Sequence, residues 1–152
     1  MPDVFTRPKR SDVMSKIRAR GNLSTEMRMI ALMREAGIKG WRRHQRLPGR
    51  PDFIFRKARV AVFVDGCFWH GCPVHYVAPR TAIGFWRKKI KGNRERDRKN
   101  SRELRARGWR VVRIWEHALR GDRRLYTIKR LQVVLAWRSP KGSGNMIGSR
   151  GR

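Results

Sequence analysis

Residues 50–75, RPDFIFRKARVAVFVDGCFWHGCPVH, contain two short apolar runs followed by a loop of Gly, Cys, His and aromatic residues. Prolines and a glycine exclude regular structure at residues 48–51. The residues that follow, 52–55, predict a short strand that begins after this loop. Residues 60–64 are apolar without alternation, which is typical of a strand covered on both faces. A polar connection at 56–59 separates the two runs. The segment therefore predicts two antiparallel strands that hold a site at their rim.

Helices and further strands are predicted on both sides of this pair. The expected elements are a basic N-terminal arm at 1–22, a helix that Ser24 caps and Gly37 ends, an edge strand at 41–47, a long helix at 82–107, a strand at 109–115, a helix at 125–137 and a disordered basic tail at 139–152. Strand, helix and strand in succession predict a parallel pair with a right-handed crossover. We expect one α/β domain at 23–138, with helices flanking a small mixed sheet.

Positive charge dominates the composition. The chain has 39 Lys and Arg residues against 11 Asp and Glu residues, a formal net charge of +28. Nucleic acid is the expected partner, because phosphate contacts release counterions. Composition alone also fits ribosomal or architectural binding. The longest apolar run, at 60–64, is too short to span a membrane, and no signal peptide is recognisable, so we expect a cytoplasmic protein.

Carboxylates and one histidine predict a catalytic metal site. Asp52 begins one strand and Asp65 ends its antiparallel partner, so the two side chains can meet. Mg²⁺ prefers such oxygen ligands and leaves coordination positions for a substrate phosphate. His70 is the candidate general base, and Glu26 points toward the inward face of its helix. The alternatives are that these acids only pair with arginines, and that Glu26 only favours the helix dipole.

A second constellation, Cys67, Cys72, His75 and the distant His117, predicts structural zinc. Two cysteines five positions apart in a reducing compartment suit a metal better than a disulfide. Thiolates and imidazoles at short spacing fit four-coordinate Zn²⁺, although the spacing is not that of a standard zinc finger. The alternative is a pair of free cysteines with a surface histidine. Such a zinc ion would tie the loop after Asp65 to the end of the last strand.

Three aromatic residues form the third predicted group. Phe68 and Trp69 lie in a polar loop, where core packing explains two large aromatics poorly, and Trp86 begins a helix. Aromatic side chains surrounded by Arg and Lys can wedge between DNA bases. The alternative is ordinary core packing, which applies most directly to Trp86.

Asp97 lies on the inward stripe of the same helix, where an acid paired with a basic residue is the simplest interpretation.

Several motifs in order resemble the very-short-patch repair (Vsr) endonucleases. The resemblance covers residues 8–137, and its motifs are GRPDF at 49–53, FVDGCFWH at 63–70, FW at 85–86, NRERD at 93–97 and GWRVVRIWEHAL at 108–119. It implies a PD-(D/E)xK, restriction-endonuclease-like fold. It also implies nicking of one DNA strand 5′ of the thymine in T:G mismatches, which arise when 5-methylcytosine deaminates, so that very-short-patch repair begins.

The resemblance assigns a catalytic role to five positions. Asp52 and the carbonyl group of Val64 match the protein ligands of Mg²⁺. Glu26 matches an acid that supports the metal's water. His70 matches the histidine that acts on the attacking water, and Asp97 matches the acid that orients this histidine.

Further positions match zinc and DNA contacts of the family. The zinc positions are Cys67, Cys72, His75 and His117. The DNA-contacting positions are the wedge residues Phe68, Trp69 and Trp86, the mismatch-facing Lys89 and Asn93, and Met14 and Ile17 in an N-terminal segment that approaches from the other groove. Asp65 stands where the best-known type of member has histidine, and His117 replaces a common cysteine. Cys67 occupies the place of a lysine in the general superfamily pattern.

We therefore expect a Mg²⁺-dependent, zinc-stabilised DNA mismatch endonuclease that works as a monomer on double-stranded DNA with a T:G pair. Its expected location is a bacterial nucleoid, and other mismatch-repair proteins are candidate partners. Two alternatives remain open. One is a restriction-type nuclease on the same fold, and the other is a non-catalytic, zinc-containing DNA-binding module.

Overall fold

The two apolar runs form the centre of the sheet. The computed structural model describes residues 7–137, and in it β2 (Phe53–Phe55) pairs antiparallel with β3 (Val60–Asp65). A turn at 56–59 joins them. All of β2 is buried, and so is all of β3 except Val64, because helices cover both faces of the sheet. The predicted antiparallel pair is confirmed.

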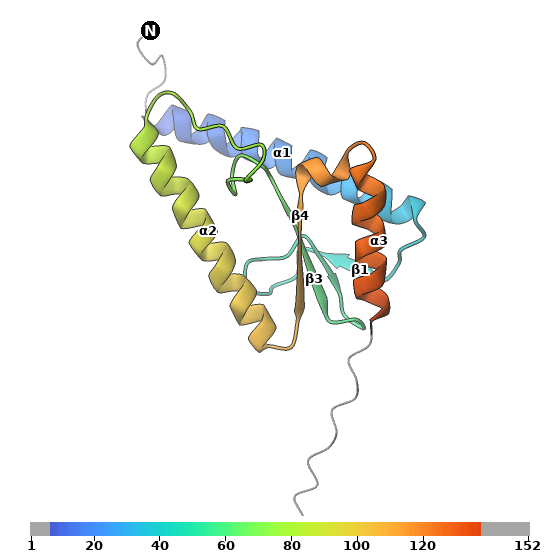
Figure 1. Cartoon of the computed structure of the whole chain (residues 1–152). Coiled ribbons are helices and arrows are strands. Elements are labelled where there is room, and N and C mark those ends of the chain that lie inside the picture. The colour runs from blue at the N-terminus through green and yellow to red at the C-terminus, as the bar shows by residue number, and fades with distance from the viewer. Residues whose placement is uncertain (1–6, 138–152) are drawn as a thin grey trace, which may run out of the picture.

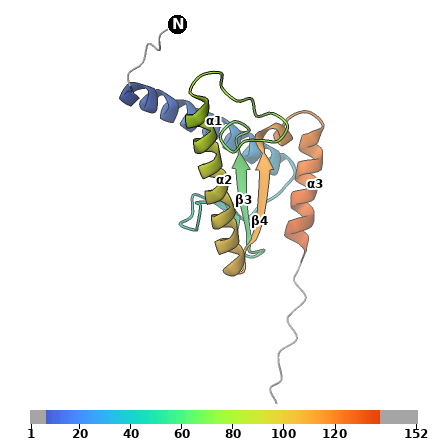
Figure 2. The same cartoon turned by 60° about the vertical axis from the view of Figure 1, so that its left-hand side comes forward.

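Two further strands complete a mixed sheet in the order β1-β2-β3-β4. β1 (Trp41–Arg43) pairs antiparallel with β2 at one edge and is shorter than the predicted strand at 41–47. β4 (Arg110–Trp115) pairs parallel with β3, as the strand–helix–strand pattern predicts. Figure 2 shows β3 and β4 pointing to the same end, beside the loop that follows β3. Side chains at the ends of both strands therefore share one edge of the sheet.

Helices cover the two faces unequally (Figure 1). α2 (Ile83–Ala106) connects β3 to β4 and buries Leu104 in a small cluster on one face. α1 (Arg7–Glu35) and α3 (Arg123–Ala136) pack on the other face, and a short 3-10 helix (Glu116–Leu119) precedes α3. The larger core on that face includes Met29, Ile30, Met33, Val62, Val112, Ile114, Leu119, Ile128 and Leu131.

The start of α1 departs from the sequence prediction. The helix expected to begin at Ser24 begins at Arg7, and Gly21 and Asn22, expected to end any earlier helical piece, lie inside it. A glycine inside a helix costs about 1 kcal/mol relative to alanine. The surrounding Arg, Lys, Ala and Met residues favour helix, so this local cost is outweighed.

Some predictions fall beyond the described chain. Residues 1–6 of the predicted arm and the predicted tail at 139–152 lie outside the described residues. Within residues 7–137, none of the helices combines the length and the apolar character that crossing a membrane requires.

Leu131→Ala is expected to lower the free energy of unfolding by about 2–5 kcal/mol, because the Leu131 side chain is fully buried between α3 and the sheet. Leu125→Ala on the same helix is the matched control. The Leu125 side chain is 61% exposed, so its removal should change this free energy by less than about 0.5 kcal/mol. Urea unfolding followed by circular dichroism measures both. Equal losses in the two variants would contradict the described packing of α3.

Candidate active site and metal centre

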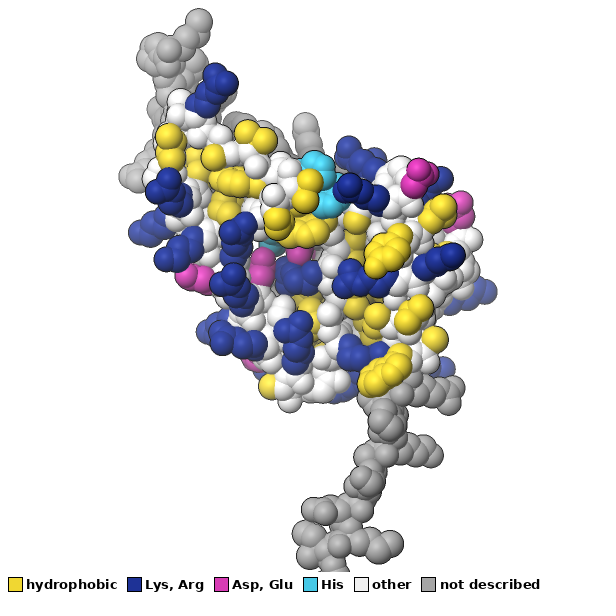
Figure 3. Space-filling view, in the orientation of Figure 1, with side chains coloured by type: hydrophobic (Ala, Val, Ile, Leu, Met, Phe, Trp, Pro, Cys, Tyr) yellow, Lys and Arg dark blue, Asp and Glu magenta, His cyan; other side chains and the backbone are white. Residues whose placement is uncertain are grey.

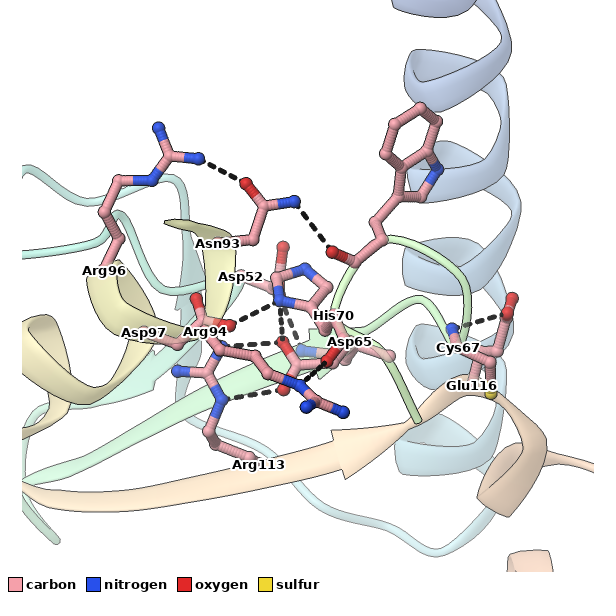
Figure 4. A network of polar contacts seen from close by, with 12 residues as sticks. Asp52, Asp65, Cys67, His70, Asn93, Arg94, Arg96, Asp97, Arg113 and Glu116 are labelled. Carbon is pink, nitrogen blue, oxygen red and sulfur yellow. Dashed lines mark hydrogen bonds and ion pairs between the residues drawn. The ribbon is translucent and has the colours of Figure 1, made fainter. Parts of the chain in front are cut away.

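Four elements bring polar side chains together at one edge of the sheet (Figure 4). Asp52 directly precedes β2, and Asp65 is the last residue of β3. His70 comes from the loop after β3, Asp97 from α2 and Arg113 from β4. The predicted proximity of these acids and His70 follows from the strand order, because β2 starts where its antiparallel neighbour β3 ends.

His70 and Asp97 form a close pair, with His70 Nδ1 2.6 Å from Asp97 Oδ2. A neutral imidazole that donates from Nδ1 leaves Nε2 as an acceptor. Burial lowers the pKa of His70, but the hydrogen bond to Asp97 and the charges of Asp65 and Asp97 outweigh it and raise this pKa overall. Burial raises the pKa of Asp97, but His70 and Arg113 outweigh that effect and lower it overall.

Arg113 joins the acids and was missed by the sequence analysis. Its Nε and Nη2 atoms donate to the two oxygens of Asp65 at 2.7 and 2.8 Å, and Nη2 lies 3.1 Å from Asp97 Oδ1. The guanidinium group also lies 4.4 Å from the ring centroid of Phe63. Asp65 is only 4% exposed, so both of its oxygens depend on this bidentate contact. The signal in the sequence was an arginine in the middle of a strand that is apolar apart from this residue and Arg110.

Asp52 and Glu26 form the other half of the site. Asp52 Oδ2 accepts the backbone N–H of Val64 at 2.7 Å, which fixes the carboxyl group beside the end of β3. Burial raises the pKa of Asp52 to about 7; the Val64 N–H opposes this, and the nearby Glu26 and Asp65 add to it. Carboxylates gathered this closely favour a bound cation, and oxygen donors of this kind suit Mg²⁺. The donor set therefore fits a divalent ion.

Glu26 lies far from the start of α1, so its alternative role as a first-turn acid is wrong. Its side chain is nearly buried and accepts a hydrogen bond from Arg43 Nη2 of β1. His44 Nε2 lies 3.5 Å from the same carboxylate. Arg43 and His44 were not predicted as partners of Glu26, because nothing in the edge strand itself shows which helix packs against it.

The four predicted zinc ligands converge, and their ligand atoms all lie within 4.8 Å of one another. Cys67 Sγ and Cys72 Sγ lie 3.2 and 3.6 Å from His117 Nδ1, and Cys72 Sγ lies 3.9 Å from His75 Nδ1. Bond lengths of about 2.0–2.3 Å to a tetrahedral ion require separations of roughly 3.3–3.8 Å between ligand atoms. Both cysteines are free thiols, so the group can hold a metal ion.

The loop that carries His70 is anchored from two sides. Asn93 Nδ2 donates to the Trp69 carbonyl at 2.7 Å, and Arg94 donates to the carbonyls of His70 and Gly71. These contacts tie the loop to α2 (Figure 4). On the other side, the Cys67 N–H donates to Glu116 Oε1 at 2.8 Å, which ties the loop to the end of β4.

The three predicted wedge aromatics form one cluster at the α2 end of this loop. Ring centroids lie 5.1 Å apart for Phe68 and Trp69, 5.2 Å for Phe68 and Trp86, and 6.0 Å for Trp69 and Trp86. All three side chains are only half-buried, and neighbouring Phe85 is 60% exposed. The cluster thus lies outside both hydrophobic cores.

The remaining predicted DNA-contacting residues lie on the two longer helices. Lys89 is half-buried on α2, three positions after Trp86. Met14 and Ile17 lie in α1, but their side chains are outside the part that the structure describes.

Comparisons with known proteins match these features. The family model described as DNA mismatch endonuclease Vsr matches residues 2–75. The DNA mismatch endonuclease Vsr of Escherichia coli (strain K12) is 35% identical over 152 residues, which cover 99% of this chain and 97% of that protein. The type II nicking enzyme V.XorIIP of Xanthomonas oryzae is 35% identical over 119 residues, 76% of this chain and 85% of that protein. The type II nicking enzyme V.NaeI of Lentzea aerocolonigenes is 50% identical over 68 residues, 45% of this chain and 41% of that protein.

The class of protein follows from these relatives and from the acid cluster: this is an endonuclease, a hydrolase that cleaves DNA. The similarity to the Escherichia coli protein extends along almost the whole of both chains. The chain belongs to the Vsr family of DNA mismatch endonucleases. Membership implies a restriction-endonuclease-like fold, and the mixed sheet between helices agrees with it.

Asp97→Asn is expected to lower the pKa of His70, because the charge that raises it is removed while burial still lowers it. NMR titration of the imidazole resonances measures this pKa, with His70→Gln used for assignment among the four histidines. Asp12→Asn is the control, since Asp12 is an exposed acid that pairs with Lys16 on α1. An unchanged His70 titration in Asp97→Asn would contradict the coupling.

Proposed function

We propose that this protein nicks one DNA strand on the 5′ side of the thymine in a T:G mismatch, with Mg²⁺ as its catalytic ion. The observation that carries the proposal is the convergence of Glu26 and Asp52 with the His70–Asp97 pair at the edge where β3 ends. Family membership supports the mismatch substrate. The net charge of +28 supports a polyanionic partner.

Asp52 and the carbonyl group of Val64 are the proposed Mg²⁺ ligands. A bound Mg²⁺ ion supplies Lewis-acid stabilisation to the phosphate and helps to activate the nucleophile. Glu26, held by Arg43, supports the same position from α1. We assign Asp65 a positioning role beside the ion, because Arg113 already takes both of its oxygens.

His70 is the proposed base. With Nδ1 donating to Asp97, its Nε2 atom can accept the proton of the water that attacks phosphorus. Asp97 keeps the imidazole in this tautomer and orientation, as the acid does in a catalytic triad. Arg113 offsets part of the rise that the two acids cause in the pKa of His70, so more of the imidazole stays neutral and able to act as a base than the acids alone would allow.

The remaining predicted residues position the DNA. Phe68 and Trp69 of the loop that carries His70 form a half-exposed aromatic cluster with Trp86 of α2, as a wedge into the duplex requires. Lys89 and Asn93 lie on the same helix as Trp86, and we propose that they face the mismatch and its flanks. Met14 and Ile17 in α1 are proposed to approach the DNA from the other groove.

The Cys67, Cys72, His75 and His117 cluster is proposed to hold one structural Zn²⁺ ion. Elemental analysis of the purified chain is expected to find one zinc per molecule, because two thiols and two imidazoles bring their ligand atoms within 4.8 Å of one another. His117→Ala should reduce this content strongly, and His44→Ala, which removes a histidine outside the cluster, should leave it unchanged. Metal-free wild-type protein, or equal zinc content in both variants, would refute the assignment.

Asp52→Asn is expected to lower the nicking rate on T:G duplexes by roughly 100-fold or more while DNA binding persists, since losing a metal ligand removes several kcal/mol of transition-state stabilisation. Asp122→Asn, at an exposed acid before α3, is the control. Nicking of end-labelled duplexes with T:G or C:G pairs measures both variants. Cutting of the C:G duplex by the wild type would favour a restriction-type nuclease, and binding without any cut would favour a non-catalytic module.

A further inference from the structure

A groove opens from the polar network of Asp65, His70, Asp97 and Arg113 and runs between α2 and β4. It has a volume of about 610 Å³, and Asp97 and Arg113 of the network line it. Its α2 wall carries Arg98, Arg102 and Arg105. Figure 3 shows Lys and Arg side chains gathered along α2 beside a hollow in which acidic side chains are visible.

The three arginines of the wall are free to bind a ligand. Arg98, Arg102 and Arg105 are all exposed, and no hydrogen-bond or ion-pair partner for them occurs among the side chains that the structure describes. Arg113, in contrast, is committed to Asp65 and Asp97. Glu95 is the one acid lining the groove that does not belong to the network, so the wall keeps an excess of positive charge.

The spacing of these arginines suits a strand of nucleic acid. Positions 98, 102 and 105 follow the i, i+4, i+7 pattern, which places the side chains on one face of a helix. Seven residues of helix span about 10 Å. A DNA strand rises about 3.4 Å per phosphate along its axis, so a row that runs along the axis spans about three phosphate-to-phosphate steps, enough for each arginine to reach a phosphate.

The order of residues along α2 gives the row a direction. The proposed recognition residues Trp86 and Lys89 lie near its start, Asp97, which positions His70, lies in the middle, and the row at 98–105 lies toward its end. The recognition residues and the arginine row are therefore on opposite sides of Asp97. In the proposed function the mismatch lies on the 3′ side of the nick, so the row faces the 5′ side.

We infer that Arg98, Arg102 and Arg105 bind the backbone phosphates of the cleaved strand on the 5′ side of the nick. The strand polarity in this inference rests on the proposed function. Guanidinium groups donate bidentate hydrogen bonds to phosphate, and each phosphate contact releases counterions. The row thereby holds the strand in line with His70 while the aromatic cluster engages the mismatch on the other side.

The test compares two triple variants with the same change in charge. Arg98→Gln, Arg102→Gln and Arg105→Gln remove the row, and Arg124→Gln, Lys129→Gln and Arg130→Gln remove three exposed charges from α3 on the opposite face of the sheet. Fluorescence anisotropy measures affinity for T:G duplexes without added Mg²⁺ over a range of salt concentrations. The row variant should bind roughly 10- to 100-fold more weakly at about 0.15 M salt, with a log–log salt slope shallower by about 2–3.

Neutral methylphosphonates then locate the contact. Three of them on the 5′ side of the nick should weaken DNA binding by the wild type and by the α3 control variant. They should not weaken DNA binding by the row variant any further. An unchanged salt slope in the row variant, or an equal loss in all three proteins, would overturn the inference. A loss that occurs only with methylphosphonates on the 3′ side would overturn it too. Nicking by the wild type tests the proposed function separately, so a failure of either is distinguishable.

Discussion

The guanidinium group of Arg113 lies between Asp65 and Asp97, and this contact allows two acids and a histidine to share one half-buried edge of the sheet. Burying a carboxylate as deeply as that of Asp65 is costly unless it is paired, and Arg113 supplies the pairing charge. The bidentate geometry fixes Asp65, and the third contact fixes Asp97 against His70. The orientation of the proposed base thus depends on a residue of a different strand.

The charges around Asp52 differ from those around Asp65, because the neighbours of Asp52 are other acids. Burial and the neighbouring acids raise the pKa of Asp52 to about 7, and the Val64 N–H offsets this only in part. The two halves of the site therefore differ in kind. In one half Arg113 pairs with both acids, whereas in the other Arg43 pairs with Glu26 and the described residues around Asp52 leave its carboxylate oxygens to favour a divalent cation. This division explains why a chain with so much positive charge still keeps an acid cluster at the rim of its central strands.

α2 and Glu116 together fix the loop that carries His70. Asn93 and Arg94 bind its backbone carbonyls from α2, and the Cys67 N–H is held by Glu116 after β4. A loop without regular structure would otherwise place a catalytic side chain loosely, which is costly because catalysis depends on orientation. The same helix carries the aromatic residue Trp86, Asp97 and the arginine row, so the residues proposed for recognition, chemistry and backbone contact share one element.

The sequence by itself determined the central strands, the parallel crossover and the group of cysteines and histidines. Continuous apolar runs, as in β3, and the short spacing of Cys67, Cys72 and His75 leave local patterns, and His117 could be added because it follows a predicted strand. Only the tertiary structure decided the long start of α1 and the partners of Glu26 and Asp65. Arg43 and Arg113 lie on strands whose contacts with distant acids depend on how helices dock and how strands align. The sequence around a charged residue in a strand does not identify its ion-pair partner, because ion pairing depends on proximity in space and not on neighbours in the chain.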